Sequence, residues 1–516
     1  MTSALEERYD DRIGGVLSCY DRVVITGTLP TVCYAEGMTR FLFANGIQIF
    51  KYPEFAMTLR ERVREQVASV VAEAGVTIEH IAKSHIRKEE VVAQVLKQRG
   101  DHPGLVHVLS AMEACPSYRP WHDKQSHKTY LRPDTGKCLH YYFYFMDADL
   151  GLVYLRVPTW APFRLQFYCN GHNWLARQLT AEGIAFTMAD NAFVRIDDWQ
   201  CAQELADGFS PDLLHRVLDR YAALCCPVLD VFGQTYHWSL MQVEYATDLV
   251  FRSAATLKPL YEQFARESVL NVKAEQVATF LGRKITPQLA GDVGSQFSTR
   301  IEGTCIKHRF GSASVKMYDK FGCVLRIETT TNDVSFFKHH RKVASVSMRL
   351  AHANETRGEH RQGPATRALA SVKKSIYSLI DLREILFGCN RRYLEHLSAL
   401  DDFSAGVRAL DRVTRPRVVD DKTVKGINFF DPTDKALLQA LQDPRVNIAG
   451  IRRGDLIPML DQLTPNRLSR QLRRLRDIGV IKRVRGTYRY YLTRMGRAAA
   501  AALCRVTESI IIPAMA

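Results

Sequence analysis

The sequence predicts a multidomain α+β protein, built from antiparallel sheets packed with helices. Its 516 residues are too many for a single hydrophobic core. A hydrophobic fraction of 46% and a charged fraction of 24% are typical of a soluble globular protein. Segments with the period of a helix alternate with short aromatic and β-branched runs that end at turn residues. Together these observations predict the α+β class.

Residues 1–135 are predicted to be rich in helix, with one short buried strand at 23–25. Residues 58–74 carry apolar side chains at helical spacing and are followed by a glycine, and residues 88–98 form a second expected helix. Residues 136–196 are instead predicted to form an antiparallel α+β unit. Its expected strands lie at 138–146, 152–157, 164–168 and 184–188, with a helix at 172–181.

Residues 197–290 are predicted to be mainly helical, and β structure returns at 296–333. The expected helices lie at 197–206, 213–224, 257–267 and 274–281, and the expected strands at 297–308, 314–319 and 324–330. Two glycines and a proline in a polar stretch predict a linker at 349–370, followed by helices at 376–386 and 391–399. The predicted organisation is an α-rich region at 1–135, an α+β core at 136–348, the linker at 349–370, a helical connector at 371–429 and a nucleic-acid-binding domain at 430–516.

The net charge of +15 is concentrated in the last third of the chain. Residues 1–337 hold 36 Lys and Arg against 38 Asp and Glu, whereas residues 338–516 hold 34 against 17. A basic surplus confined to one region indicates a polyanionic partner bound there. A solvated basic surface that serves solubility is the alternative explanation.

The 12 cysteines form no C-x-x-C pair and no quartet with histidine at zinc spacing, so we expect reduced thiols in a cytoplasmic protein. No apolar run approaches the roughly 20 residues of a membrane helix, and we expect no membrane partner. The motifs of P-loop ATPases, zinc proteases, serine hydrolases and dinucleotide-binding enzymes are absent from the sequence, so these classes have no support.

Arginines crowd a predicted helix at 464–476, which holds five of them. Four apolar residues from Leu468 to Ile478 are spaced to face inward, which leaves most of the arginines outside. A basic β-hairpin is expected at 481–492 and a closing helix at 495–509. A cationic helix face backed by a cationic hairpin is typical of small domains that grip a nucleic-acid backbone. The residues expected to contact nucleic acid are Arg467, Arg470, Arg473, Arg474, Lys482, Arg483, Arg485, Thr487 and Arg489.

This order of helices, hairpin and closing helix resembles the winged helix-turn-helix of MarR-like and PadR-like bacterial regulators. Residues 490–497 are similar to their wing-to-helix junction, Y-x-L-T-x-x-G-R, and the resemblance covers about residues 430–505. It implies a recognition helix in the major groove of DNA and a wing beside the backbone. A winged helix that contacts protein is the alternative. The whole chain also resembles a bacterial family labelled MarR-like for this tail, in the stretches 138–145, 157–163, 315–331 and 336–341, and no activity comes with that resemblance.

The hairpin at 314–330 carries a second group of reactive side chains. Tyr318, Asp319 and Glu328 are the candidate catalytic residues, with Glu328 and Asp319 as ligands of Mg²⁺ or Mn²⁺ and Tyr318 as a nucleophile. About 15 residues here are similar to strands of rolling-circle replication initiators, although the His-x-His metal motif of those enzymes is absent from the chain. The alternative is a salt-bridged hairpin in which Glu328 pairs with Arg326 or Lys316.

His140, Tyr142 and Tyr144 of the aromatic strand are candidates for stacking on nucleic-acid bases, unless the strand serves only the core. From the residues we expect a nucleic-acid-binding regulator or mobile-element factor. Duplex DNA is the favoured partner, and RNA is the alternative. The alternative is a metal-dependent nuclease, similar to a replication initiator or a transposase. No cofactor is evident, and a divalent metal is expected only in the nuclease case. The oligomeric state is left open.

Overall fold

The structure, a computed structural model, describes residues 4–83, 85–284, 293–300, 303–343, 366–401, 404–443, 450–507 and 512–515. The chain divides into two compact units, Met1–Ser398 and Ala399–Ala516, each described here by itself. Within the described residues, no helix combines the length and the apolarity that crossing a membrane requires.

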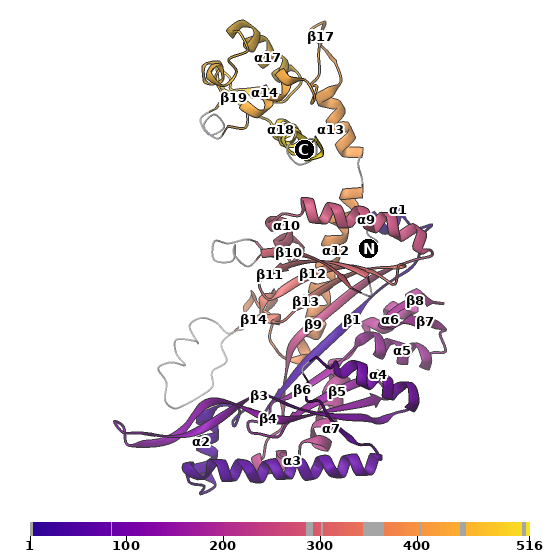
Figure 1. Cartoon of the computed structure of the whole chain (residues 1–516), viewed down its shortest axis with the longest axis vertical. Coiled ribbons are helices and arrows are strands. Elements are labelled where there is room, and N and C mark those ends of the chain that lie inside the picture. The colour runs from indigo at the N-terminus through magenta and orange to yellow at the C-terminus, as the bar shows by residue number, and fades with distance from the viewer. Residues whose placement is uncertain are drawn as a thin grey trace. The chain divides into compact units, whose positions relative to one another are not determined.

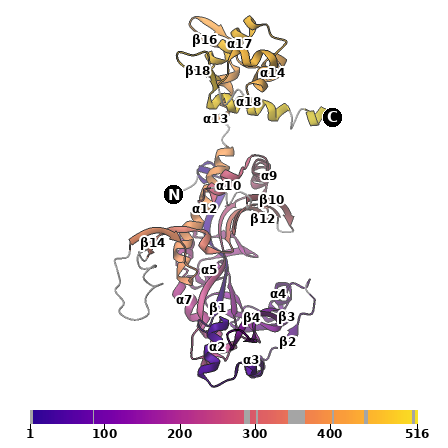
Figure 2. The same ribbon diagram turned by 90° about the vertical axis from the view of Figure 1, so that its left-hand side faces the viewer.

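One large sheet runs through the first unit (Figures 1 and 2). Its strands are β1 (Ile13–Thr28), β2 (Ile78–His80), β3 (Gly104–Asp123), β4 (Lys128–Asp147), β5 (Gly151–Pro158), β6 (Leu165–Cys169), β9 (His237–Phe251), β10 (Val293–Arg300), β11 (Gly303–Phe310), β12 (Ala313–Lys320) and β13 (Val324–Thr331). They are ordered β10-β11-β12-β13-β9-β1-β6-β5-β4-β3-β2. Among the strand pairs of the described residues, only β2 and β3 are parallel. The sheet is therefore mixed, and the predicted α+β class is confirmed.

Helices and two smaller strand pairs surround this sheet. The pairs are β7 (Phe186–Ala189) with β8 (Ala192–Ile196), and β14 (Lys338–Val343) with β15 (Thr366–Ser371). The helices are α1 (Ala4–Arg8), α2 (Ala35–Ala44), η1 (Ile49–Lys51), α3 (Tyr52–Ala74), α4 (Lys88–Arg99), α5 (Gly171–Ala181), α6 (Trp199–Asp207), α7 (Pro211–Cys225), α8 (Leu229–Phe232), α9 (Ala254–Asn271), α10 (Ala274–Phe280), η3 (Val334–Phe336), η4 (Ile376–Ser378) and α12 (Leu379–Asp401).

Local sequence explains where several of these helices begin and end. The Asn170 side chain accepts hydrogen bonds from the first backbone amides of α5, and Ser210 followed by a proline begins α7 in the same way. Gly75 ends α3 with a φ of 64°, a left-handed conformation that glycine adopts without a steric penalty.

The two faces of the sheet differ at β9, β12 and β13. Residues opposite one another share a face, and the pairs Lys316–Glu328 and Arg326–Asp248 lie on the same side. The other side is covered by α9 and α12: Asn390 of α12 accepts a hydrogen bond from Thr329, while α9 packs against β9, β12 and β13. Charged residues are therefore gathered on the face that α9 and α12 leave free.

The second unit is smaller and mainly helical. Its elements are α13 (Ser404–Thr414), β16 (Arg417–Val419), β17 (Lys422–Val424), α14 (Pro432–Ala440), α16 (Arg453–Leu456), η5 (Ile457–Met459), α17 (Pro465–Asp477), β18 (Ile481–Arg483), β19 (Tyr490–Leu492), α18 (Arg494–Val506) and α19 (Ile512–Met515). The predicted apolar stripe of α17, from Leu468 to Ile478, lies in its core with Leu437 and Leu503. That core buries one side of α17 and leaves the arginine side outward.

Several element predictions are corrected by the structure. The region 197–290, predicted to be mainly helical, contains β9, a long central strand that was not expected. The expected strand at 297–308 is two strands, β10 and β11, and the two helices expected at 376–399 are the single helix α12. The sheet crosses the boundary expected at residue 135, since β4 spans it, and residues 1–135 contain β1, β2 and β3 where one short strand at 23–25 was expected. Most of the expected linker lies outside the described residues, and its last residues belong to β15.

Candidate functional site

The predicted hairpin of β12 and β13 forms in the expected register, but its residues do not all meet. Lys316 lies opposite Glu328, and Tyr318 lies opposite Arg326, on one face. Asp319 is on the other face, where it lines a hollow beside Lys258 and Tyr261 of α9. Burial raises the pKa of Asp319, and its Oδ1 atom has no hydrogen-bond partner among the described residues. Asp319 therefore cannot act together with Glu328.

Glu328 meets two other carboxylates, Asp21 of β1 and Glu244 of β9. One oxygen of each lies within 4.8 Å of the others, and all three residues are buried. The strand order places β9 between β13 and β1, so Glu244 reaches both neighbours. Asp21 lies at a register shift of β1, between Tyr20 and Arg22, and such a bulge re-aims a side chain. We call these three residues the acidic triad.

Lys316 forms ion pairs with two members of the acidic triad, Glu328 and Glu244. Its Nζ atom lies 2.5 Å from Glu328 Oε1 and 3.2 Å from Glu244 Oε1. The hydroxyl of Thr330 donates to the same Glu244 oxygen at 3.2 Å. Burial raises the pKa of Glu328 to about 7, against the opposing effect of Lys316 and with the help of the nearby Glu244 carboxylate. The predicted salt-bridged hairpin is thus present, with Lys316 as the direct partner.

Arg326 is fully buried beside the acidic triad, and its guanidinium is engaged in hydrogen bonds and ion pairs. It donates two hydrogen bonds of 2.7 Å to Asp248 and one of 2.8 Å to the Asn191 carbonyl, and it lies 3.5 Å from Asp21. Although burial opposes ionisation, Arg326 brings the pKa of Asp248 down to about 2 and holds that of Asp21 well below its usual range. Arg326 orients two acids and has no donor directed at solvent.

Tyr318 is poorly suited to the nucleophilic role predicted for it. Burial raises the pKa of its phenol, with a further contribution from the Glu328 carboxylate. A nucleophile needs an adjacent base or a lowered pKa, and Tyr318 has the opposite shift.

Arg22 is a residue of this region that the sequence reading missed. Its side chain is 44% exposed, its Nε atom lies 3.9 Å from Glu244 Oε2, and its guanidinium lies over the ring of Tyr168 at 5.2 Å. Arg22 lines a cleft together with Asn170 and Asn191, and both of these amides donate to Asp21. Three polar residues that line this cleft therefore contact members of the acidic triad.

The expected stacking residues of β4 are engaged elsewhere. His140 and Tyr144 are buried, and the Tyr142 hydroxyl donates to the Glu113 carboxylate at 2.7 Å. The half-buried tyrosines on this side belong to the neighbouring strands, Tyr154 on β5 and Tyr168 on β6.

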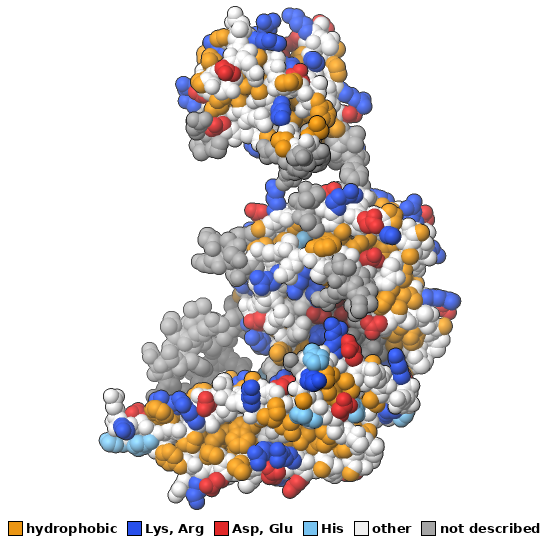
Figure 3. Space-filling model, in the orientation of Figure 1, with side chains coloured by type: hydrophobic (Ala, Val, Ile, Leu, Met, Phe, Trp, Pro, Cys, Tyr) orange, Lys and Arg blue, Asp and Glu red, His pale blue; other side chains and the backbone are white. Residues whose placement is uncertain are grey.

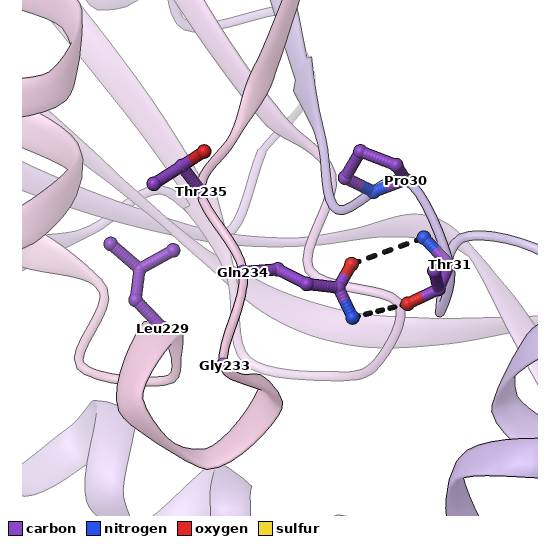
Figure 4. A pocket seen from close by; sticks show the side chains of 6 residues that line it. All are labelled: Pro30, Thr31, Leu229, Gly233, Gln234 and Thr235. Carbon is purple, nitrogen blue, oxygen red and sulfur yellow. Dashed lines mark hydrogen bonds between the residues drawn. The ribbon is translucent and has the colours of Figure 1, made fainter.

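A separate hollow lies between Pro30–Thr31 and Leu229–Thr235 (Figure 4). The amide of Gln234 is hydrogen-bonded to the backbone and the hydroxyl of Thr31. Its lining residues include no ionisable side chain, so it offers no acid–base or metal chemistry.

In the second unit, most of the predicted contact residues are exposed. They are Arg467, Arg470 and Arg473 on α17 and Lys482, Arg483 and Arg485 on the hairpin of β18 and β19. Across the described part of the chain, no acidic side chain forms an ion pair with Arg467, Arg470, Arg473, Lys482 or Arg485. Lys and Arg side chains stand out on the visible face of this unit (Figure 3).

The tip of this hairpin is held by its own hydrogen bonds. The Thr487 hydroxyl donates to the Val484 carbonyl at 3.0 Å, and the Arg483 Nε atom donates to the Thr487 carbonyl at 2.6 Å. The guanidinium of Arg483 lies over the exposed ring of Tyr488 at 4.9 Å. Thr487 and Arg489 are half-buried, and we assign Thr487 to shaping the tip.

Arg474 does not belong to the exposed set. It is bonded to the buried carboxylate of Asp434 on α14, and its side chain is 15% exposed. Arg474 therefore joins two helices of the unit. Arg452 and Arg453, at the start of α16, are exposed cations that sequence reasoning missed, and Arg453 donates to Ser469 of α17 at 3.1 Å.

Comparisons with known proteins add no further identification: no protein-family model, no curated protein and no solved structure matches this chain.

Proposed function

We propose that this protein binds nucleic acid through a winged helix-turn-helix of the MarR-like and PadR-like kind in its second unit. Duplex DNA is the favoured partner, and RNA is the alternative. The observation that carries the proposal is the outward face of α17 and of the adjoining hairpin, where exposed cations without acidic partners stand on a helix whose other face is buried.

The arrangement of elements supports the same proposal. Helices α14, α16 and α17 are followed by the hairpin and by α18. Ile451, just before α16, bridges to Tyr490 of β19 and adds a third short segment to the hairpin. In winged-helix regulators such an order presents the third helix to the major groove and the hairpin to the backbone. The second unit holds 22 Lys and Arg against 12 Asp and Glu, which suits a polyanionic partner.

Duplex binding by the full chain and by a chain ending at Ser398 tests this proposal. We expect the full chain to bind with an affinity that falls steeply with salt, by a log–log slope of about 0.9 for each phosphate contacted. The shortened chain keeps the first unit but loses the basic surface, so it should bind far more weakly at matched salt. Equal affinity of the two chains would refute the proposal.

A second candidate function is metal-dependent cleavage of phosphodiesters at the acidic triad. The observation that favours it is the convergence of Asp21, Glu244 and Glu328 from three strands beside a cleft. Carboxylate oxygens are the ligands that Mg²⁺ and Mn²⁺ prefer, and in the structure the Lys316 ammonium already bridges two of the three carboxylates. Incubation with Mg²⁺ or Mn²⁺ and labelled single- and double-stranded DNA and RNA tests it. Cleavage lost in Glu244→Gln would support an enzyme, and no cleavage of any substrate would leave the binding function alone.

A further inference from the structure

A two-stranded arm projects from the first unit, formed by the outer ends of β3 and β4 (Figure 1). Strand β2 pairs with β3 only at residues 108–110, and β5 pairs with β4 only from His140 onward. Beyond these points, β3 and β4 pair only with each other among the described residues, up to the turn between Asp123 and Lys128. The outer ends therefore form a narrow ribbon, and we call its residues 117–134 the arm.

One face of the arm is fixed to the chain around α2. Tyr118 and Leu131 are buried, and the Tyr118 hydroxyl donates to the Val32 carbonyl at 2.8 Å. The backbone amide of Leu131 donates to the hydroxyl of Thr39 in α2 at 3.0 Å. These contacts hold the arm in place, and they leave its opposite face and its tip to a partner.

That opposite face and the tip are cationic. The arm holds four cations against two acids: Arg119, Lys124, Lys128 and Arg132 against Asp123 and Asp134. The register places Arg119 opposite Arg132 and Trp121 opposite Tyr130, and these four side chains share the face that Tyr118 does not occupy. Among the described residues, none of the four cations forms an ion pair. Figure 3 shows cationic and histidine side chains gathered at this end of the molecule.

The aromatic residues of this face orient a cation without neutralising it. The Arg132 guanidinium lies over the ring of Trp121 at 4.1 Å and donates to the Tyr130 hydroxyl at 2.9 Å. The Asp123 carboxylate is engaged in the turn, where it accepts hydrogen bonds from the Gln125 amide and the Ser126 hydroxyl. Arg132 therefore keeps its charge and its remaining donors for an anionic partner, and it loses less side-chain entropy on binding.

We propose that the arm is a second contact with duplex DNA, in which its free face lies against the duplex and its four cations contact backbone phosphates. Unpaired cations on a supported ribbon suit a polyanion, and a two-stranded ribbon fits the major groove, which is about 12 Å wide. This inference rests on the proposed function, because the second unit is what indicates nucleic acid as the ligand class. The exposed cations of α17 and its hairpin outnumber those of the arm, so the second unit remains the main contact.

Chemical acetylation of the lysines in the full chain, with and without a DNA duplex, tests the proposal. We expect the duplex to protect Lys124 and Lys128, as mapped by mass spectrometry, and to leave Lys258, an exposed lysine of α9, as reactive as before. Lys124→Ala with Lys128→Ala should lower the salt slope of duplex binding by about 1.8, which corresponds to two lost phosphate contacts. The matched control is Lys97→Ala with Lys258→Ala, which removes two exposed lysines from α4 and α9 and should leave the slope unchanged.

Lys124 and Lys128 that stay reactive in the presence of the duplex, or a slope that is the same with and without them, would overturn the proposal. If Arg467→Ala with Arg470→Ala still lowers the slope in that case, the proposed function stands without the arm. A slope that falls for the arm variant and not for the α17 variant would instead refute the proposed function and keep the arm. Protection of both lysines by phosphatidylserine vesicles, and not by the duplex, would overturn the proposal in favour of a lipid surface.

Discussion

The two charged regions of this protein are built in opposite ways. On the central sheet, Asp21, Asp248, Glu328, Lys316 and Arg326 are largely buried, and each of them has a partner of opposite charge within 4 Å. On the outer face of α17 and its hairpin, five exposed cations lack acidic partners among the described residues: Arg467, Arg470, Arg473, Lys482 and Arg485. Buried charges of opposite sign offset the cost of their desolvation by pairing. Exposed charges of the same sign repel one another, and binding an anion relieves that repulsion.

This difference separates two consequences of mutation. Removing a charge from the central sheet leaves the oppositely charged partner buried without its ion pair, so the free energy of unfolding should fall. Removing a charge from the α17 surface relieves repulsion and exposes nothing, so the loss should be measured as affinity for a polyanion. Each of the following predictions tests this contrast, from the largest expected effect to the smallest.

Arg326→Leu should have the largest effect. It leaves Asp248 and Asp21 buried without their guanidinium, at a cost of about 3–5 kcal/mol in the free energy of unfolding. Denaturant titration followed by circular dichroism gives the free energy of unfolding of the wild type and of the variant, and their difference is this cost. The control is Arg195→Leu, whose ion pair with Asp197 is exposed and should contribute at most about 1 kcal/mol. Equal midpoints for the two variants would show that Arg326 does not hold the two acids.

Glu328→Gln should have the next largest effect, a change in how stability varies with pH, because glutamine replaces a neutral carboxyl at low pH and a buried carboxylate at high pH. The pKa of Glu328 is raised to about 7 in the folded state, above the ordinary value of 4.5. Between these values the folded state binds the extra proton, so this group's contribution is full below pH 4.5 and is lost as the pH rises through 7.

Melting temperatures of the wild type and Glu328→Gln between pH 5 and pH 8 measure that contribution. We expect the wild type to lose stability relative to Glu328→Gln as the pH rises, because glutamine has no proton to lose. Comparing the two proteins cancels the effect of other groups, such as His308, whose pKa burial lowers to about 4. A constant difference would contradict the raised pKa. Unchanged stability together with lost Mg²⁺-dependent cleavage would make Glu328 catalytic.

Arg467→Ala with Arg470→Ala should reduce the salt slope of duplex binding by about 1.8 and leave stability nearly unchanged. Arg474→Ala is the matched comparison on the same helix. Because Arg474 is bonded to buried Asp434, its loss should cost about 1–3 kcal/mol in stability and leave the slope as it is. Fluorescence anisotropy over a series of salt concentrations gives the slopes. The reverse pattern would exchange the roles assigned to these arginines.

The sequence predicted best the features that depend on neighbours along the chain. The hairpin of β12 and β13 and the apolar stripe of α17 follow from local periodicity, and both form as expected. The exposure of the individual arginines was predicted less well. Helix α17 has arginines on adjacent positions, and periodicity alone did not show that Arg474 reaches Asp434, 40 residues earlier.

The acidic triad was predicted only in part because its members come from distant strands. Asp21 and Glu328 lie on the two strands that flank β9, and β9 lies in a region predicted to be mainly helical. A signal was present in that strand, where Trp238, Val243, Tyr245 and Thr247 are the aromatic and β-branched residues that favour β structure. Even so, the strand order cannot be read from one sequence, and without it Glu244 has no reason to be paired with Glu328.

Lys482→Ala should have the smallest effect, a fall of about 0.9 in the salt slope with stability changed by no more than about 0.5 kcal/mol. Lys482 is exposed on β18 beside α17, so the proposed interface includes it. Lys422→Ala is the control, since Lys422 is an equally exposed lysine of the same unit on the separate pair of β16 and β17. A slope that falls for Lys482 alone would locate the interface on α17 and its hairpin. A slope that falls equally for both would mean that net charge, rather than a defined surface, drives the binding.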